Sequence, residues 1–223
     1  MKNLDFNFIF IDICKNSGTS IIDGFQKKFP ELEFEGKHHS IPNFTSNITC
    51  SHINKEDYNN FFFFTVIRNP YDRLVSLYNW GSEYHNNSTF EQFILNISKN
   101  YYKEFSGHRY KTQKEWISND KGEIIVKNII RFENINIDFN KILKKLNIPN
   151  FTIKNQNCRT RYEYLPTKHY SYYYNKTSIN IVNKLYKDDL ELFGYNFENI
   201  DNIDIDSINY NSNYCGNKIY KKM

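Results

Sequence analysis

The pattern of apolar and polar positions predicts strands and helices in alternation. Residues 8–13 form a nearly continuous apolar run, which is typical of a buried parallel strand. After a turn of small residues, apolar side chains recur at helical spacing over residues 21–29, and Pro30 ends the pattern. Residues 61–67 are apolar or β-favouring throughout and end at Arg68, so they give the strongest strand prediction.

The residues after Arg68 carry the signals of a helix start. Asn69 suits the N-cap, Pro70 suits the first helical position, and Asp72 places negative charge in the first turn. Weaker patterns predict strands at 34–38, 47–51 and 124–132 and helices at 89–97, 136–146 and 177–193. Thr89 is the expected cap of the first of these helices. Gly194 is a natural C-cap for the last of these helices.

Strands that alternate with helices indicate an α/β fold. We expect a P-loop-like three-layer architecture, in which helices flank a mostly parallel central sheet. The length of 223 residues suits one domain, which we place at 1–197, followed by an Asn-rich tail at 198–223. Ligands of such folds bind at the carboxyl ends of strands.

The first candidate site lies where the first strand meets the first helix. Unpaired amides at a helix N-terminus attract anions, and a glycine lets the backbone approach them closely. Lysine and hydroxyl side chains add further donors. The segment consists of Lys15, Asn16, Ser17, Gly18, Thr19 and Ser20, called the 15–20 loop below. The nucleoside-triphosphate pattern G-x-x-x-x-G-K-[ST] is absent from it, because its lysine precedes the glycine.

The second candidate site lies at the end of the 61–67 strand. A guanidinium held there can make bidentate contacts to a phosphate, and this is the role we assign to Arg68. Ser76 lies two turns into the following helix. For Arg73 we favour a structural role, either a salt bridge or a capping contact.

Composition and charge narrow the choice of function. The net charge of +4 is scattered along the chain, so no basic stripe indicates nucleic-acid binding. The four cysteines have no metal-ligand spacing and are expected to be free thiols. Asp5, Asn7 and Asp12 interrupt the N-terminal apolar run, which excludes it as a signal peptide or membrane anchor. We therefore expect a soluble, cytoplasmic protein with no membrane span and no metal.

The two motifs together resemble the 5′-phosphosulfate and 3′-phosphate motifs of sulfotransferases that use PAPS (3′-phosphoadenosine-5′-phosphosulfate). The resemblance is to the carbohydrate and heparan sulfate 2-O-sulfotransferase group, with its bacterial and viral relatives. It also covers a central segment, Ile130-Arg131-Phe132-Glu133-Asn134, and a C-terminal segment that begins at His169-Tyr170. The 15–20 loop keeps the lysine and the Gly-Thr pair of the family pattern Pro-Lys-Thr-Gly-Gly-Thr, whereas Cys14, Asn16 and Ser17 depart from it.

The resemblance implies a cofactor, PAPS, and a role for each motif. The 15–20 loop would hold the 5′-phosphosulfate, and Arg68 with Ser76 would hold the 3′-phosphate that distinguishes PAPS from ATP. The segment that contains Thr167 and Lys168 would close over the 3′-phosphate and adenine. Lys15 would stabilise the leaving phosphate oxygen.

The reaction also needs a base that removes the proton of the acceptor hydroxyl. Histidine suits this task near neutral pH, and the family places it at the end of a strand shortly before the arginine. His52 fits this placement best, His39 is the second candidate and His38 the third. A carboxylate, Glu56 or Glu83, is the remaining alternative.

The predicted function is transfer of a sulfuryl group from PAPS to a hydroxyl of a glycan or another acceptor. Two other functions stay open, a P-loop-type kinase of small molecules and a non-catalytic module that binds PAPS or its product. A Mg²⁺ requirement would favour the kinase. No motif in the sequence identifies the acceptor.

Overall fold

The computed structural model describes residues 8–30, 44–46, 61–80, 88–99, 107–153 and 169–199. The chain divides into two compact units. The first unit comprises residues 1–67 and 113–154 and contains the sheet. The second comprises residues 68–112 and 155–223, and its described elements are helices.

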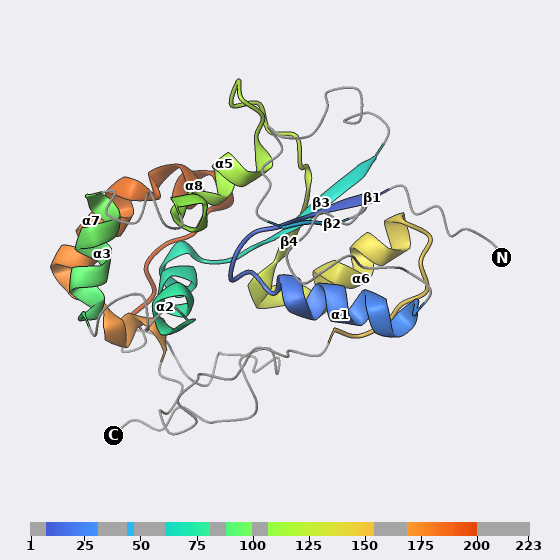
Figure 1. Ribbon diagram of the computed structural model, residues 1–223, viewed down its shortest axis with the longest axis horizontal. Coiled ribbons are helices and arrows are strands. Elements are labelled where there is room, and N and C mark those ends of the chain that lie inside the picture. Colours follow the sequence, from blue (N-terminus) through green and yellow to red (C-terminus); the bar gives the residue numbers. More distant parts are fainter. Residues whose placement is uncertain are drawn as a thin grey trace. The chain divides into compact units, whose positions relative to one another are not determined.

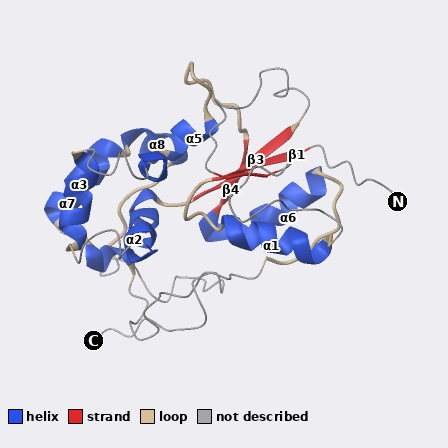
Figure 2. Ribbon diagram, viewed as in Figure 1, coloured by secondary structure: helices blue, strands red, loops and turns tan. Residues whose placement is uncertain are grey.

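The first unit is built on a four-stranded sheet in the order β2-β1-β3-β4, formed by β1 (Phe8–Asp12), β2 (Phe44–Ser46), β3 (Phe62–Ile67) and β4 (Asn128–Arg131). Each neighbouring pair is parallel (Figures 1 and 2). From β1 the chain continues to β2 on one side, whereas β3 and β4 lie on the other side. The strand order therefore reverses between β1 and β3, and their carboxyl ends flank the position where open parallel sheets bind ligands.

Two helices, α1 (Gly18–Lys28) and α6 (Ile135–Lys145), cover one face of this sheet and lie side by side in Figure 1. The core between them and the sheet is rich in aromatic side chains: Phe8, Phe10, Phe25, Phe64 and Phe139 are all fully buried. The unit also contains a short helix, α5 (Gln113–Ile117), and a 3-10 turn, η5 (Phe132–Asn134). The expected α/β fold with a parallel sheet is confirmed.

The second unit packs helices around tyrosine and phenylalanine rings. Its elements are α2 (Pro70–Trp80), α3 (Phe90–Ser98), η4 (Gly107–Tyr110), η6 (Tyr170–Tyr173), α7 (Lys176–Leu185) and α8 (Lys187–Phe193). Helix α3 packs against α7, and η6 packs against α2. The ring of Tyr71 contacts Tyr170, Tyr174 and Phe197. Segments about 100 residues apart in sequence thus share one core.

Most of the strong sequence predictions are confirmed. The strands at 8–13 and 61–67 correspond to β1 and β3, and the helices at 21–29, 89–97 and 136–146 correspond to α1, α3 and α6. The Thr89 hydroxyl caps α3 by accepting a hydrogen bond from the Gln92 amide at 3.2 Å. Gly194 ends α8 in the left-handed conformation, with φ of 68°.

Two predictions differ from the structure in extent. The predicted strand at 124–132 is reduced to β4, because Phe132 already begins η5. The predicted strands at 34–38 and 47–51 lie outside the described residues, and the strand in this region is β2.

The predicted single helix at 177–193 is wrong, since the chain forms two helices that meet at Tyr186. Tyr186 leaves the helical conformation, with φ of −110° and ψ of 22°. Its side chain is buried, and its hydroxyl donates a hydrogen bond to the Tyr110 carbonyl at 2.8 Å. This tertiary contact accompanies a break that the apolar spacing does not reveal.

Replacing Tyr186 with phenylalanine is expected to lower the free energy of unfolding by about 1 kcal/mol, because the partly buried Tyr110 carbonyl loses this donor. Chemical denaturation monitored by circular dichroism measures the change. Tyr172→Phe is the matched control, since Tyr172 is 55% exposed and its change should stay within about 0.5 kcal/mol. Equal stability of the two variants would contradict a structural role for the Tyr186 hydroxyl.

Candidate functional site

The 15–20 loop leaves β1 in an unusual backbone conformation. Lys15 and Ser17 both adopt positive φ angles, 70° and 67°, which residues with a side chain seldom do. Between them, the Asn16 amide donates a hydrogen bond to the Ile13 carbonyl at 3.1 Å. Alternation of right- and left-handed residues turns successive amides toward one side and creates a concavity for anions. Backbone strain of this kind concentrates at functional sites.

Helix α1 begins without a cap. Ser17 occupies the N-cap position, but its side chain accepts no hydrogen bond from the helix. The first amide that bonds back into the helix is that of Ile21, which donates to the Ser17 carbonyl at 3.1 Å. Within the described residues, the amides of Ser17, Gly18 and Thr19 form no hydrogen bond. The first turn therefore presents donors and the positive end of the helix dipole to a ligand.

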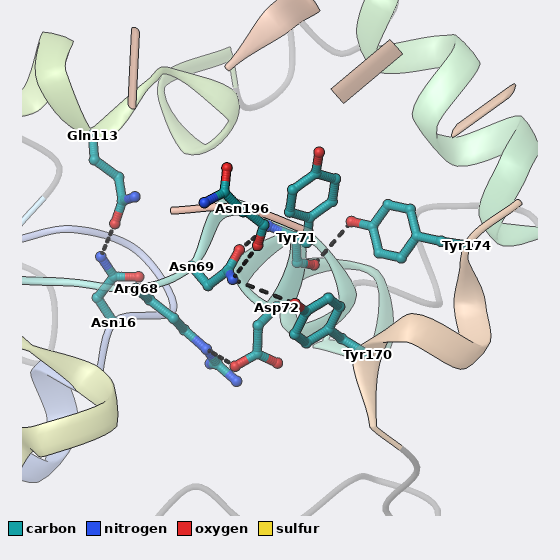
Figure 3. Close-up of polar contacts among 9 residues, drawn as sticks. All are labelled: Asn16, Arg68, Asn69, Tyr71, Asp72, Gln113, Tyr170, Tyr174 and Asn196. Atoms are coloured by element: carbon teal, nitrogen blue, oxygen red, sulfur yellow. Dashed lines mark hydrogen bonds and ion pairs between the residues drawn. The ribbon is translucent and has the colours of Figure 1, made fainter. Parts of the chain in front are cut away.

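The side chain of Asn16 points into the first unit. Its amide nitrogen donates to the Val66 carbonyl and to the Gln113 side-chain oxygen, both at 2.7 Å; the second contact is drawn in Figure 3. Asn16 is only 1% exposed. Its side chain thus ties the loop to β3 and to the start of α5, and its backbone amide is bonded to the Ile13 carbonyl, so both nitrogens of Asn16 already have protein partners. Sequence reasoning did not identify Gln113, which lies 97 residues away.

The other residues of the loop differ in exposure. Thr19 is exposed, Lys15 and Ser17 are half-buried, and Ser20 is buried. Gly18 is also buried, and its place in the loop is set by Asp12 at the end of β1. A Cβ atom on Gly18 would lie 1.8 Å from Oδ1 of Asp12, so only glycine fits here without displacing the carboxyl. Burial raises the pKa of Asp12 to about 7, although attraction to Lys15 acts in the opposite direction.

The second motif begins the second unit. The Arg68 Nε donates to Oδ2 of Asp72 at 2.7 Å, and both side chains are largely buried, at 14% and 13% exposure (Figure 3). Asp72 therefore orients the guanidinium at the start of α2. Ser76 is half-buried and lies one turn beyond Asp72, so it shares that face of the helix with the carboxylate that holds Arg68.

Asn69 joins the start of α2 to the C-terminal segment. Its side-chain oxygen accepts a hydrogen bond from the Tyr71 amide at 3.1 Å, the expected capping interaction. Its nitrogen donates to the Asn196 carbonyl at 3.2 Å and to the Tyr170 hydroxyl at 3.4 Å (Figure 3). These contacts hold in place the turn that carries Arg68.

The structural role expected for Arg73 is carried by hydrogen bonds to backbone carbonyls. Its side chain is fully buried and donates to the carbonyls of Arg109 and Lys111, at 2.7 and 3.0 Å. These bonds connect α2 to the segment that follows α3.

The remaining predicted site residues lie outside the described residues: His38, His39, His52, Glu56, Glu83, Thr167 and Lys168. Their roles stay predictions. His169, the next residue along the chain, is described and is buried. Its Nδ1 accepts a hydrogen bond from the Ser171 amide at 3.3 Å and thereby caps η6. Burial lowers the pKa of His169, and the negative charge of Asp72 opposes that shift.

Comparison with known proteins identifies the class. The family model described as "Sulfotransferase family" matches residues 14–196, which include both motifs and most of the chain. The chain belongs to the sulfotransferase family, and its chemistry is therefore sulfuryl transfer in general. No curated protein and no solved structure matches the chain.

Two further observations concern only the described residues. They contain no group of three or more histidine, cysteine or carboxylate side chains that could hold a metal ion. None of their helices has both the length and the apolar character needed to cross a membrane.

The contact between Gly18 and Asp12 predicts a dependence of one substitution on the other. Gly18→Ala is expected to lower the free energy of unfolding by about 1–3 kcal/mol, because the new methyl group overlaps the carboxyl. In an Asp12→Ala background the same change should cost markedly less. A double-mutant cycle measured by denaturant unfolding tests this coupling. Additive effects of the two substitutions would contradict the contact.

Proposed function

We propose that this sulfotransferase takes PAPS as its donor and transfers the sulfuryl group to a hydroxyl of a carbohydrate or a similar acceptor. The observation that carries the proposal is the uncapped start of α1, where the amides of Ser17, Gly18 and Thr19 form no hydrogen bond within the described residues. Lys15 precedes them, just after the end of β1. The end of the neighbouring strand β3 leads directly into Arg68.

The 15–20 loop suits the 5′-phosphosulfate end of the donor. The amides of Ser17, Gly18 and Thr19 are directed donors, and their geometry is fixed before the ligand arrives by the inward hydrogen bonds of Asn16. Donors that need no rearrangement stabilise developing charge most effectively. Lys15 adds a full positive charge beside them.

Arg68 suits the 3′-phosphate. A guanidinium is always charged and presents donors in a rigid fork, and the bond from its Nε to Asp72 fixes the orientation of that fork. Ser76 adds a hydroxyl on the same face of α2. Recognition of the 3′-phosphate would separate PAPS from ATP and ADP.

PAPS supplies the sulfuryl group, and the chain supplies positions and charges. Lys15 and the amides of the 15–20 loop neutralise charge on the leaving phosphate oxygen. The acceptor oxygen forms a bond to sulfur while the bond from sulfur to that phosphate oxygen breaks, and adenosine 3′,5′-bisphosphate leaves. His52, or His39 in its place, takes the proton of the acceptor hydroxyl.

Binding of adenosine 3′,5′-bisphosphate tests the donor assignment. We expect it to raise the melting temperature clearly, because a ligand at about 100 times its Kd stabilises the folded state by about 2.7 kcal/mol. ADP, which lacks the 3′-phosphate, should have a much smaller effect, and Arg68→Ala should remove the difference. Thermal shift measurements give all three results.

The control variant is Lys187→Ala. Lys187 is an exposed cation of the same unit, with a side-chain exposure of 68%, so its loss should leave both shifts unchanged. Equal shifts with the bisphosphate and ADP in the unsubstituted protein would refute recognition of the 3′-phosphate.

Substitution of the candidate histidines tests the chemistry. With an acceptor found by screening hydroxyl compounds against labelled PAPS, the histidine that acts as base should lose about 10²–10⁴-fold in kcat when replaced by alanine. Binding of adenosine 3′,5′-bisphosphate should be retained. Full activity in both His52→Ala and His39→Ala would exclude each of them as the base. Absence of sulfation with every acceptor, despite tight binding, would favour a non-catalytic module.

A further inference from the structure

Asp12 is the one ionisable residue of the β1 strand, and it ends that strand immediately before the loop. Alternation along the strand places Asp12 on the same face of the sheet as Phe8 and Phe10, which face α1 in the core. Its carboxyl reaches the first residue of α1, as the 1.8 Å between Oδ1 and a Cβ on Gly18 demonstrates. An acidic group thus lies directly beneath the backbone that is suited to an anion.

Asp12 is half-buried at the end of its strand, and its carboxyl is desolvated there. Within the described residues it forms no hydrogen bond. Its Coulombic partner is Lys15, and desolvation outweighs that attraction, since the pKa of Asp12 is raised to about 7. Near neutral pH the carboxyl therefore exists in both protonation states.

Among the described residues, Lys15 is the charged group that acts on Asp12. The flanking strands β2 and β3 contain no ionisable residue. Helix α1 carries Asp23, Lys27 and Lys28 further along its length. On α6, Asp138 is paired with Lys141, and Lys145 donates to Asn128. Cys14 lies two residues after Asp12, before the 15–20 loop, and is half-buried.

An ionised Asp12 and a bound anion compete for the same positive charges. Both are stabilised by Lys15 and by the positive end of α1, and they repel each other across the thin layer of backbone at Gly18. Protonation of the carboxyl removes that repulsion. The positive charge of Lys15 then attracts the ligand without competition from the carboxylate.

We propose that Asp12 is a positioning residue of the anion site that takes up a proton when a phosphate or phosphosulfate enters the 15–20 loop. The proton comes from solvent and forms an O–H bond on the carboxyl, so ligand binding and protonation are linked. The nature of the anion rests on the proposed function, whereas the linkage itself requires only that an anion binds to this loop.

The test is isothermal titration calorimetry of the full chain with adenosine 3′,5′-bisphosphate. Measurements in two buffers of different ionisation enthalpy give the number of protons taken up per ligand, at pH values between 6 and 8. The unsubstituted protein is compared with Asp12→Asn, which keeps the shape of the side chain, and with Asp12→Ser. The control is Asp23→Asn, which removes a carboxylate from α1 away from the loop.

We expect the unsubstituted protein to take up roughly half a proton more than Asp12→Asn at pH 7. The ionised carboxylate repels the anion. The Kd of the unsubstituted protein for the bisphosphate should therefore rise about fivefold from pH 7 to pH 8, relative to the Kd of Asp12→Asn. The phosphates of the ligand titrate equally in every variant and cancel in the comparison. Asp12→Ser should match Asp12→Asn, and Asp23→Asn should match the unsubstituted protein.

The outcomes separate the two proposals. Tight binding with the same proton uptake in the unsubstituted protein and in both Asp12 variants would overturn the role of Asp12 and leave the donor assignment intact. Failure of the unsubstituted protein to bind the bisphosphate would refute the donor assignment, and the proposed linkage would fall with it.

Discussion

The candidate site depends on how closely the first turn of α1 approaches the end of β1. Gly18 makes that approach possible, because a side chain at this position would overlap the Asp12 carboxyl. Within the described residues, the N-terminal amides of α1 have no side-chain cap. The strained angles of Lys15 and Ser17 are maintained by bonds on the inner side of the loop, from Asn16 to Val66 and Gln113. The donors are thus rigid before any ligand binds, which is the property that charge stabilisation requires.

The second motif is organised differently. Arg68 is held by a carboxylate in the first turn of the helix that follows it, and the turn that carries Arg68 is fixed by Asn69 through contacts with Tyr170 and Asn196. A buried pair of this kind contributes orientation rather than much stability, because desolvation of both charges offsets their attraction. Two local structures, one cradle of amides and one oriented guanidinium, therefore follow adjacent parallel strands.

Secondary structure could be predicted from the sequence where neighbouring residues determine it. The apolar runs of β1 and β3, the Asn-Pro start of α2 and the Thr89 cap are each set by a few neighbouring residues, so pattern and propensity predicted them. Gln113 and the break at Tyr186 depend on partners 97 and 76 residues away, which no local pattern specifies. Asp12 was noted only as an interruption of an apolar run. An acid at the end of a buried strand, just before an anion loop, is a signal of its own, but its raised pKa follows from desolvation in the folded chain.

The proposed function assigns the 5′-phosphate of the donor to the 15–20 loop and its 3′-phosphate to Arg68. A crystal structure of the chain with adenosine 3′,5′-bisphosphate tests it most directly. We expect the 5′-phosphate within hydrogen-bond distance of the amides of Ser17, Gly18 and Thr19, and the 3′-phosphate on the guanidinium of Arg68. A bisphosphate bound with its 5′-phosphate away from these amides, or with its 3′-phosphate away from Arg68, would contradict the account.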